Sequence, residues 1–328
     1  MTFCFDPFKS LNITAEGISS CCVMPTWEVD NIDFQNDATL QEIRNQWNKN
    51  TWPAACYACK KFENEGFASR RQAIPAWMSG NNVTDTSVEL IRLDYWCGNM
   101  CNLRCAICGP ENSIAWQKEL GILKSERTRI TNHKWDQIDI SKLKWVHFNG
   151  GEPLLNKEHL DLLKAIPVPE NVILNYNTNG TVRASVELIA LWEKFKLVQL
   201  DFSIDDIGER FEYQRYPASW DEVVSNLDWY RDTMPVNIMF DIAATVSILN
   251  ASNQHNIQAW FSENFSTNRV TDPIRYRTQP AYGVLAVDGN AQNAKNYLDQ
   301  IDKRRGTSWA EVFPELAPIL NKSINITL

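Results

Sequence analysis

The sequence predicts an α/β fold, in which a partial (β/α)6 TIM-like barrel follows a small, cysteine-rich N-terminal domain. Two observations support this prediction. Short runs rich in β-branched residues alternate with helical patterns from residue 88 to residue 277, as in a parallel sheet. All nine cysteines of the 328-residue chain lie in its first 108 residues. The predicted parts are the cysteine-rich domain at 1–78, the barrel at 79–285 and a C-terminal helical segment at 286–328.

The N-terminal domain is expected to hold two short strands and one helix. Strand-like runs lie at 10–13 and 18–23. A helix follows them, because Leu40, Ile43 and Trp47 recur at helical spacing. A segment of this size buries little apolar surface, so a bound metal would help to stabilise it.

Strands and helices alternate beyond a polar linker at 79–82. Parallel barrels carry their chemistry at the C-terminal ends of their strands, so motifs at those ends are of most interest. The expected strands are 88–95, 145–148, 172–176, 197–204, 236–246 and 273–277. The expected helices are 114–120, 160–166, 186–195, 220–230 and 254–261.

Composition excludes several classes of protein. The hydrophobic fraction of 44% and the charged fraction of 22% are those of ordinary globular domains. A net charge of −8 provides no general attraction for nucleic acid or for anionic membranes, so neither is expected as a partner. The first residues lack the pattern of a signal peptide, and no run of eighteen apolar residues occurs. A cytoplasmic protein is therefore expected, in which clustered cysteines indicate metal ligation and not disulfides.

Three cysteines follow the first predicted barrel strand with the spacing C-x3-C-x2-C, namely Cys101, Cys105 and Cys108. Thiolates are the usual ligands of iron–sulfur clusters, and a compact run lets one loop wrap one cluster. Three ligands for four irons leave one iron open to bind another molecule. The alternative is a zinc site completed by Cys97. If Cys97 is not a zinc ligand, three interpretations are open: a remote ligand, a catalytic group or a buried thiol. The buried thiol is the default interpretation.

Further motifs lie at the ends of successive predicted strands. Gly-Gly-Glu-Pro at 150–153 ends the second strand, and Asn-Thr-Asn-Gly at 177–180 ends the third. Ser203 and Asp205 end the fourth, and Arg215 lies in a Gln-Arg-Tyr sequence soon after it. Each motif alone is explained by a turn or a helix cap. Turns do not explain why the motifs occur together in this order.

The cysteine triplet and these motifs together resemble the radical SAM family, over residues 86–250. The resemblance implies that the triplet holds a [4Fe–4S] cluster whose open iron chelates the amino and carboxylate groups of S-adenosylmethionine (SAM). It also implies reductive cleavage of SAM to methionine and a 5′-deoxyadenosyl radical, which abstracts hydrogen from a substrate. The residues that would contact SAM are Gly150, Gly151, Glu152, Asn179, Ser203, Asp205 and Arg215.

The N-terminal cysteines resemble the SPASM or twitch domain of radical SAM enzymes, in which a C…G-x4-C hairpin and a later C-x2-C hold an auxiliary [4Fe–4S] cluster. Four residues separate Gly17 from Cys22, which points to Cys22 as a ligand with Cys21 as its alternative. Such domains usually follow the barrel, so the order here is permuted. Too few cysteines are available for two auxiliary clusters, and structural zinc remains an alternative. The implied ligands are Cys4, Cys22, Cys56 and Cys59.

The resemblance also implies partners. A peptide or protein substrate, modified in the manner of a maturase, is the leading expectation, together with a reductant such as flavodoxin or ferredoxin. The alternatives are a nucleoside or small-molecule substrate, and a non-catalytic module that binds zinc or an iron–sulfur cluster. Packing or solvation is the simpler explanation for the side chains that would face a substrate. These are His147, Asn149, Tyr176, Arg275, Tyr276 and Arg277.

Overall fold

The structure is a computed structural model that describes residues 3–72, 86–122, 134–265, 275–281 and 283–321. Its mixed α/β fold, with mostly parallel strands, confirms the predicted fold class in that general form. The predicted linker at 79–82 and the first residues of the predicted 273–277 strand lie outside the described residues. Closure of the strands into a partial barrel stays a prediction.

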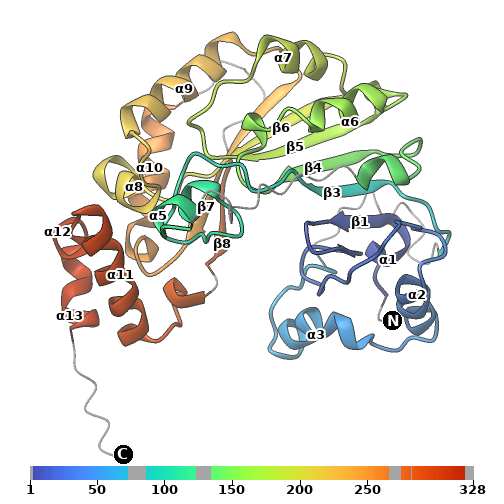
Figure 1. Ribbon diagram of the computed structural model, residues 1–328, viewed down its shortest axis with the longest axis horizontal. Helices are drawn as coiled ribbons and strands as arrows, with labels where there is room; N and C mark the ends of the chain where they lie inside the picture. Colours follow the sequence, from blue (N-terminus) through green and yellow to red (C-terminus); the bar gives the residue numbers. More distant parts are fainter. Residues whose placement is uncertain (1–2, 73–85, 123–133, 266–274, 282, 322–328) are drawn as a thin grey trace, which may run out of the picture. The chain divides into compact units, whose positions relative to one another are not determined.

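The helices and strands follow the expected alternation (Figure 1). The strands are β1 (Ser10–Ile13), β2 (Ile18–Ser19), β3 (Arg92–Trp96), β4 (Trp145–Asn149), β5 (Ile173–Thr178), β6 (Leu197–Phe202), β7 (Ile238–Val246) and β8 (Arg275–Pro280). The helices are α1 (Asp6–Lys9), α2 (Ala38–Asn48), α3 (Tyr57–Asn64), α5 (Ile114–Glu119), α6 (His159–Ala165), α7 (Val186–Trp192), α8 (Gly208–Gln214), α9 (Trp220–Thr233), α10 (Gln254–Asn264), α11 (Ala291–Arg305), α12 (Trp309–Val312) and α13 (Ala317–Leu320).

The chain divides into two compact units. The first contains Met1–Gly98, Ile130–Tyr176 and Val186–Val198, and the second contains Asn99–Arg129, Asn177–Ser185 and Gln199–Leu328. Among the described residues, no helix has the length and apolar character needed to cross a membrane. The predicted domain boundaries after residues 78 and 285 stay predictions.

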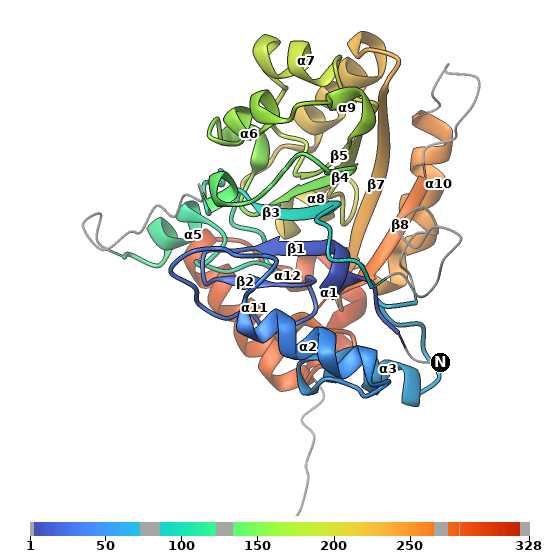
Figure 2. The same cartoon turned by 90° about the vertical axis from the view of Figure 1, so that its right-hand side faces the viewer.

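In the first unit the strand order is β2-β1-β3-β4-β5. β1 pairs antiparallel with β2 and parallel with β3, in a register that sets Ser10 opposite Arg92 and Ile13 opposite Tyr95. β3, β4 and β5 continue the sheet in parallel. The N-terminal strands therefore extend the same sheet as β3–β5, as Figure 2 shows, and they cover the edge that β3 would otherwise expose.

Aromatic stacking forms the core of the first unit between its sheet and α6 and α7. The ring of Phe148 stacks on that of Tyr176 at 4.6 Å, and Tyr176 meets Trp192 at 5.2 Å. His159 of α6 packs against both Phe148 and Tyr176. Tyr176 is fully buried in this stack, so packing accounts for a residue that the sequence had placed among possible substrate contacts.

In the second unit β6, β7 and β8 are neighbours in that order, and α10 covers one side of β8, where Tyr276 donates to Gln254 Oε1 at 2.7 Å. The C-terminal helices α11, α12 and α13 gather together (Figure 1). Leu298 and Ile301 of α11 share a hydrophobic core with Ala106 and Trp116. This core attaches the C-terminal segment to the residues around the cysteine triplet.

Candidate functional site

The three cysteines of the triplet lie on the loop at 101–108, called the cysteine loop here, in the second unit just before α5. Two backbone amides, those of Arg104 and Ala106, donate at 2.7 Å to the carbonyl oxygens on either side of Arg215. The loop therefore lies beside the segment that carries this arginine. Cys105 is buried, and the other two cysteines are partly exposed.

Two side chains that were predicted to contact SAM reach the sulfur atoms of the loop. Asn179 Nδ2 lies 4.0 Å from Cys101 Sγ, and Arg215 Nη1 lies 4.0 Å from Cys105 Sγ. A 3.0 Å hydrogen bond to Asn102 Oδ1 holds the Asn179 side chain against the loop. The structure thus brings together the triplet, the Asn-Thr-Asn-Gly turn and the arginine.

Burial sets the protonation state of the thiols in the absence of metal. It raises the pKa of Cys105 and raises that of Cys108 to about 12, while the guanidinium of Arg215 partly offsets the rise at both cysteines. Iron–sulfur ligation requires thiolates. Without metal, the raised pKa values favour neutral thiols at Cys105 and Cys108, and metal binding would release their protons.

Asp205 and Arg215 form a buried ion pair. Asp205 is fully buried, and its Oδ2 accepts from both Nε and Nη2 of Arg215 at 2.8 Å. Its Oδ1 accepts the backbone amide of Thr245, also at 2.8 Å. Both carboxylate oxygens of Asp205 therefore have partners within the protein, which the sequence did not indicate. The role that these contacts give Asp205 is to orient Arg215. Ser203 at the same strand end is partly exposed, and the contacts of Ser203 and Asp205 with SAM stay predictions.

The Gly-Gly-Glu-Pro motif follows β4 in the first unit. Gly150 has a φ of +120°, and a Cβ atom there would stand 2.7 Å from Gly98 O. Gly151 donates its amide to the same oxygen at 2.7 Å. This close approach of two chain segments requires glycine at position 150. Glu152 is 1% exposed and accepts the amide of Leu154 at 3.1 Å, and the contact of this motif with SAM stays a prediction.

Cys97 has the surroundings of a structural thiol. It is 2% exposed, and burial raises its pKa. Its Sγ lies 3.9 Å from the carbonyl oxygen of Tyr95, and its own carbonyl accepts the side-chain amide of Asn156. These contacts agree with the default interpretation of Cys97 as a buried thiol.

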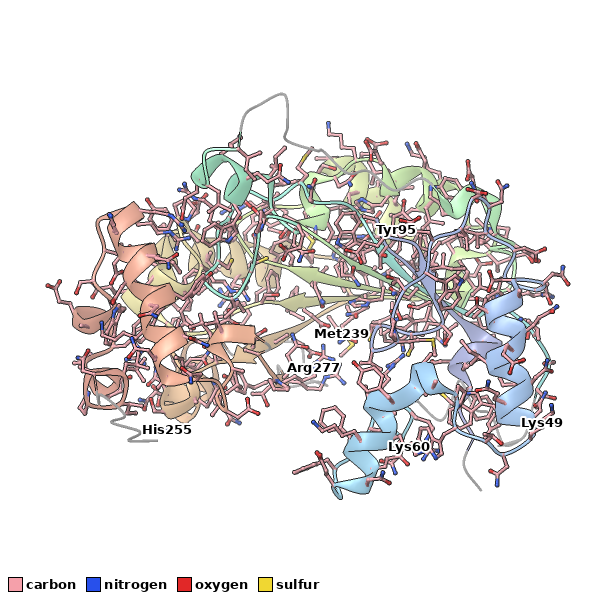
Figure 3. All side chains as sticks on the ribbon, turned by 60° about the horizontal axis from the view of Figure 1, so that its bottom comes forward. Lys49, Lys60, Tyr95, Met239, His255 and Arg277 are labelled. Atoms are coloured by element: carbon pink, nitrogen blue, oxygen red, sulfur yellow. The ribbon has the colours of Figure 1, made fainter. Side chains whose placement is uncertain are left out.

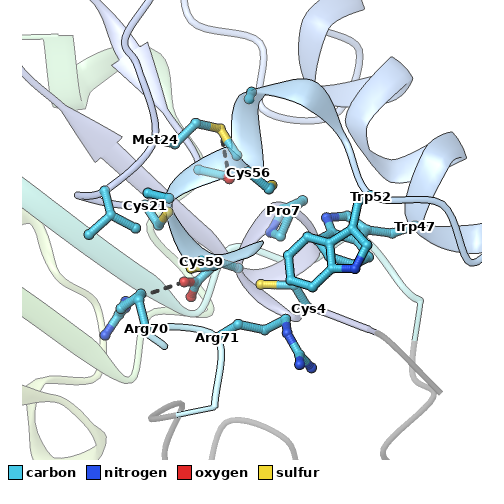
Figure 4. Close-up of a pocket in the computed structure, with 15 residues that line it drawn as sticks. Cys4, Pro7, Cys21, Met24, Trp47, Trp52, Cys56, Cys59, Arg70 and Arg71 are labelled. Atoms are coloured by element: carbon cyan, nitrogen blue, oxygen red, sulfur yellow. Dashed lines mark hydrogen bonds and ion pairs between the residues drawn. The ribbon is translucent and has the colours of Figure 1, made fainter. Parts of the chain in front are cut away.

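Four N-terminal cysteines line one pocket in the first unit, namely Cys4, Cys21, Cys56 and Cys59 (Figure 4). Cys22 is exposed and does not line this pocket. The structure therefore favours Cys21, the alternative that the sequence left open. Spacing from Gly17 could not separate two adjacent cysteines, because the side to which each points depends on the turn that follows β2.

A partly buried cation lines the same pocket. Arg70 Nε is 3.4 Å from Asp6 Oδ2, and within the described part of the chain Nε and Nη2 of Arg70 have no hydrogen-bond acceptor. Trp47 and Trp52 close another side, with ring centroids 5.0 Å apart. Four thiols beside a guanidinium that still has N–H groups to offer suit a metal centre with net negative charge. In the regions described, no three His, Cys, Asp or Glu side chains already surround a single-ion position.

Sequence reasoning missed the residues that hold the cysteine loop from the C-terminal segment. Tyr297 and Arg305 of α11 donate to the carbonyl oxygens of Ala106 at 2.8 Å and of Arg104 at 2.7 Å. No motif marks these residues. The available signal was the amphipathic pattern of α11, which predicts a packed helix but does not name the segment it packs against.

Residues 97–247 match the protein-family model described as the Radical SAM superfamily. The match covers just under half of the chain. The matched residues include the cysteine loop and all the strand-end motifs up to Arg215. Proteins of this family hold a [4Fe–4S] cluster and bind SAM, and the thiols of the cysteine loop are a suitable donor set for such a cluster.

Curated relatives that match this stretch are enzymes, which supports the prediction of a radical SAM enzyme. The chain is 31% identical over 118 residues to a GTP 3′,8-cyclase of Syntrophomonas wolfei, covering 34% of each protein. It is 34% identical over 85 residues to a 7-carboxy-7-deazaguanine synthase of Thermoplasma acidophilum, covering 26% of this chain and 35% of the relative. The chain thus spans about a third of the length of these relatives.

Streptococcus suis SuiB bound to its precursor peptide SuiA aligns with a TM-score of 0.44 and 15% identity, over 89% of this chain and 60% of that chain. At this level of similarity the alignment carries no functional information about the present chain.

Proposed function

We propose that the protein cleaves SAM reductively at a [4Fe–4S] cluster held by Cys101, Cys105 and Cys108. The observation that carries this proposal is the approach of Asn179, after β5, and Arg215, at the end of α8, to within 4.0 Å of two of the three sulfur atoms. When bound, the cluster supplies one electron that splits SAM into methionine and a 5′-deoxyadenosyl radical, which takes a hydrogen atom from the substrate.

The residues of the domain have separate roles in this proposal. Arg215 Nη1, which makes no bond to Asp205, is the nitrogen offered to the SAM carboxylate, and the guanidinium charge also offsets the thiolates. Asp205 acts through Arg215 by fixing its orientation. Ser203 is offered to the ribose. The backbone of the 150–153 motif is offered to the SAM amino group.

We further infer that Cys4, Cys21, Cys56 and Cys59 bind one auxiliary [4Fe–4S] cluster. Support comes from their shared pocket, from the unsatisfied N–H groups of Arg70 and from the resemblance to SPASM and twitch domains. The enclosed space is small, about 20 Å³, so a cluster requires the cysteine side chains to turn outward. Structural zinc on the same thiols is the alternative, because four thiolates suit both metals.

Iron and sulfide quantitation under anaerobic conditions tests both sites, together with EPR of the reduced protein with and without SAM. Wild type is expected to hold about eight irons, and a Cys101→Ala/Cys105→Ala/Cys108→Ala variant about four. SAM is expected to change the spectrum of wild type only. Zinc in place of iron, or a wild-type spectrum indifferent to SAM, would contradict the proposal.

Two adjacent cysteines provide a matched pair for the auxiliary site. Cys21→Ala is expected to lose the metal of the N-terminal pocket, whereas Cys22→Ala is expected to keep it, because only Cys21 lines the pocket. Metal content and the SAM-insensitive EPR signal are measured on both variants. Metal loss from Cys22→Ala alone would identify Cys22 as the ligand.

A polar surface on β6–β8 is the proposed substrate contact. Asp201 lies near the C-terminal end of β6, two residues before Ser203. The side chains of Asp201 and Asp241 are 7% and 1% exposed, whereas those of their partners Arg277 and Arg275 are 45% and 54% exposed. Arg277 is labelled in Figure 3. Buried carboxylates thus hold two guanidinium groups whose exposed edges suit a substrate carboxylate or phosphate.

We propose a peptide or protein substrate on the strength of the SPASM resemblance. A nucleotide is the second candidate, favoured by the names of the relatives, GTP 3′,8-cyclase and 7-carboxy-7-deazaguanine synthase. The reduced, loaded enzyme is incubated with SAM and either GTP or a peptide library, and 5′-deoxyadenosine is measured. Stimulation by peptides alone supports the first candidate, and consumption of GTP supports the second.

A further inference from the structure

Side chains outside the cysteine loop hold three consecutive carbonyl oxygens in it. From residue 104 to residue 106, the donors are in order Arg305 Nη2 at 2.7 Å, Trp116 Nε1 at 3.0 Å and Tyr297 Oη at 2.8 Å. Two of the three donors belong to α11, 191 and 201 residues further along the chain than their acceptors. The peptide groups on both sides of Cys105 are therefore fixed by a distant helix.

Arg305 also places a buried charge beside the loop. Its side chain is 2% exposed, and its Nε lies 3.2 Å from both oxygens of Glu119, whose side chain is 6% exposed. Glu119 is shared with Arg104 Nε at 3.3 Å. The rings of Trp116 and Tyr216 each have their centroid 4.8 Å from Arg305 Cζ. Two cations that share one carboxylate leave a net positive charge next to the triplet.

From these contacts we infer that α11 is a clamp on the cysteine loop, in which Tyr297 and Arg305 are positioning residues for the SAM-binding cluster. The inference rests on the proposed ligation of a cluster by this loop. The hydrogen bonds from these side chains fix the peptide groups of the cysteine loop, and so keep the three thiols in place. An iron that dissociates then meets the same arrangement of thiols and is bound again. The buried guanidinium also favours the reduced cluster, because reduction adds negative charge in a medium of low dielectric constant.

Four variants of the full chain test the clamp. Tyr297→Phe removes one hydroxyl group, Arg305→Met removes the charge, and Arg305→Lys keeps the charge without the paired donors. Arg304→Met is the matched control, because Arg304 is the exposed neighbour on the same helix. Each protein is reconstituted anaerobically. Iron release to a chelator is timed, and the midpoint potential of the SAM-sensitive EPR signal is measured.

Tyr297→Phe and Arg305→Met are expected to release the triplet iron about tenfold faster than wild type, given the strength of one such hydrogen bond. Arg305→Met is also expected to shift the midpoint potential to a more negative value. Arg305→Lys is expected to retain most of the wild-type potential, and Arg304→Met to retain both properties. A role limited to general folding would leave the potential unchanged.

The possible failures are distinguishable. Absence of SAM-sensitive iron from wild type overturns the proposed function and the clamp together. When that iron is present in wild type, equal release rates and potentials in Arg305→Met and Arg304→Met overturn the clamp alone. If Arg305→Met does not fold, the Tyr297→Phe release rate decides the question, because that change removes a single oxygen atom.

Discussion

Replacing Arg215 with methionine is expected to lower the free energy of unfolding by about 3–5 kcal/mol, because it leaves a buried carboxylate without its counter-ion. Asp205 is fully buried, and Arg215 supplies two 2.8 Å contacts to one of its oxygens. The amide of Thr245 would remain as the partner of the other oxygen. Urea denaturation of the metal-free protein, followed by circular dichroism, measures the loss without any contribution from a cofactor.

An exposed ion pair provides the control for this prediction. Arg231 contacts Asp228 at 2.7 Å, and the two side chains are 24% and 44% exposed, so Arg231→Met is expected to cost at most about 1 kcal/mol. Asp205→Asn combined with Arg215→Met is expected to recover part of the loss, because the double variant no longer buries an unpaired charge. Equal losses from Arg215→Met and Arg231→Met would contradict the assigned role of the buried pair.

The strands were the best-predicted part of the fold. The expected strand at 145–148 is β4 (Trp145–Asn149), and the one at 172–176 is β5 (Ile173–Thr178). Both contain β-branched and aromatic residues whose burial leaves a strong local pattern. The expected strand at 197–204 was too long, since β6 ends at Phe202. Ser203 and Asp205 lie beyond the end of the strand, and Asp205 pairs with Arg215, which an apolar pattern does not show.

Features that depend on distant contacts were not predictable. The parallel pairing of β1 with β3 joins segments about 80 residues apart, and no local pattern specifies it. Asp205 can be buried because it pairs with Arg215. The sequence does not show that pairing, and the residue type alone suggested only a polar contact. Tyr297 contacts Ala106 in the cysteine loop, although the two residues are 191 positions apart in the sequence. The cysteine triplet was recognisable from its spacing, whereas Tyr297 and Arg305, which contact its loop, belong to no motif.

Gly17→Ala is expected to cost about 3 kcal/mol or more, because the new methyl group would collide with backbone. Gly17 has a φ of +143°, and a Cβ atom there would stand 1.9 Å from Trp27 O. That oxygen cannot retreat freely, since Ile18 and Trp27 exchange two backbone hydrogen bonds of 3.0 Å. The hairpin therefore has to open, and the same hairpin leads directly into Cys21.

Gly66→Ala separates the collision from the backbone strain. Gly66 also has a positive φ, +83°, but a Cβ atom there would meet nothing within 4 Å, so a cost of about 1–2 kcal/mol is expected. Unfolding free energy and metal content are measured for both variants. Loss of the N-terminal metal from Gly17→Ala alone, with the SAM-sensitive signal retained, would show that the hairpin positions Cys21 independently of the cysteine loop. Equal costs and equal metal contents would mean that the hairpin tolerates a side chain at position 17, and that its close approach to Trp27 is not needed to build the pocket.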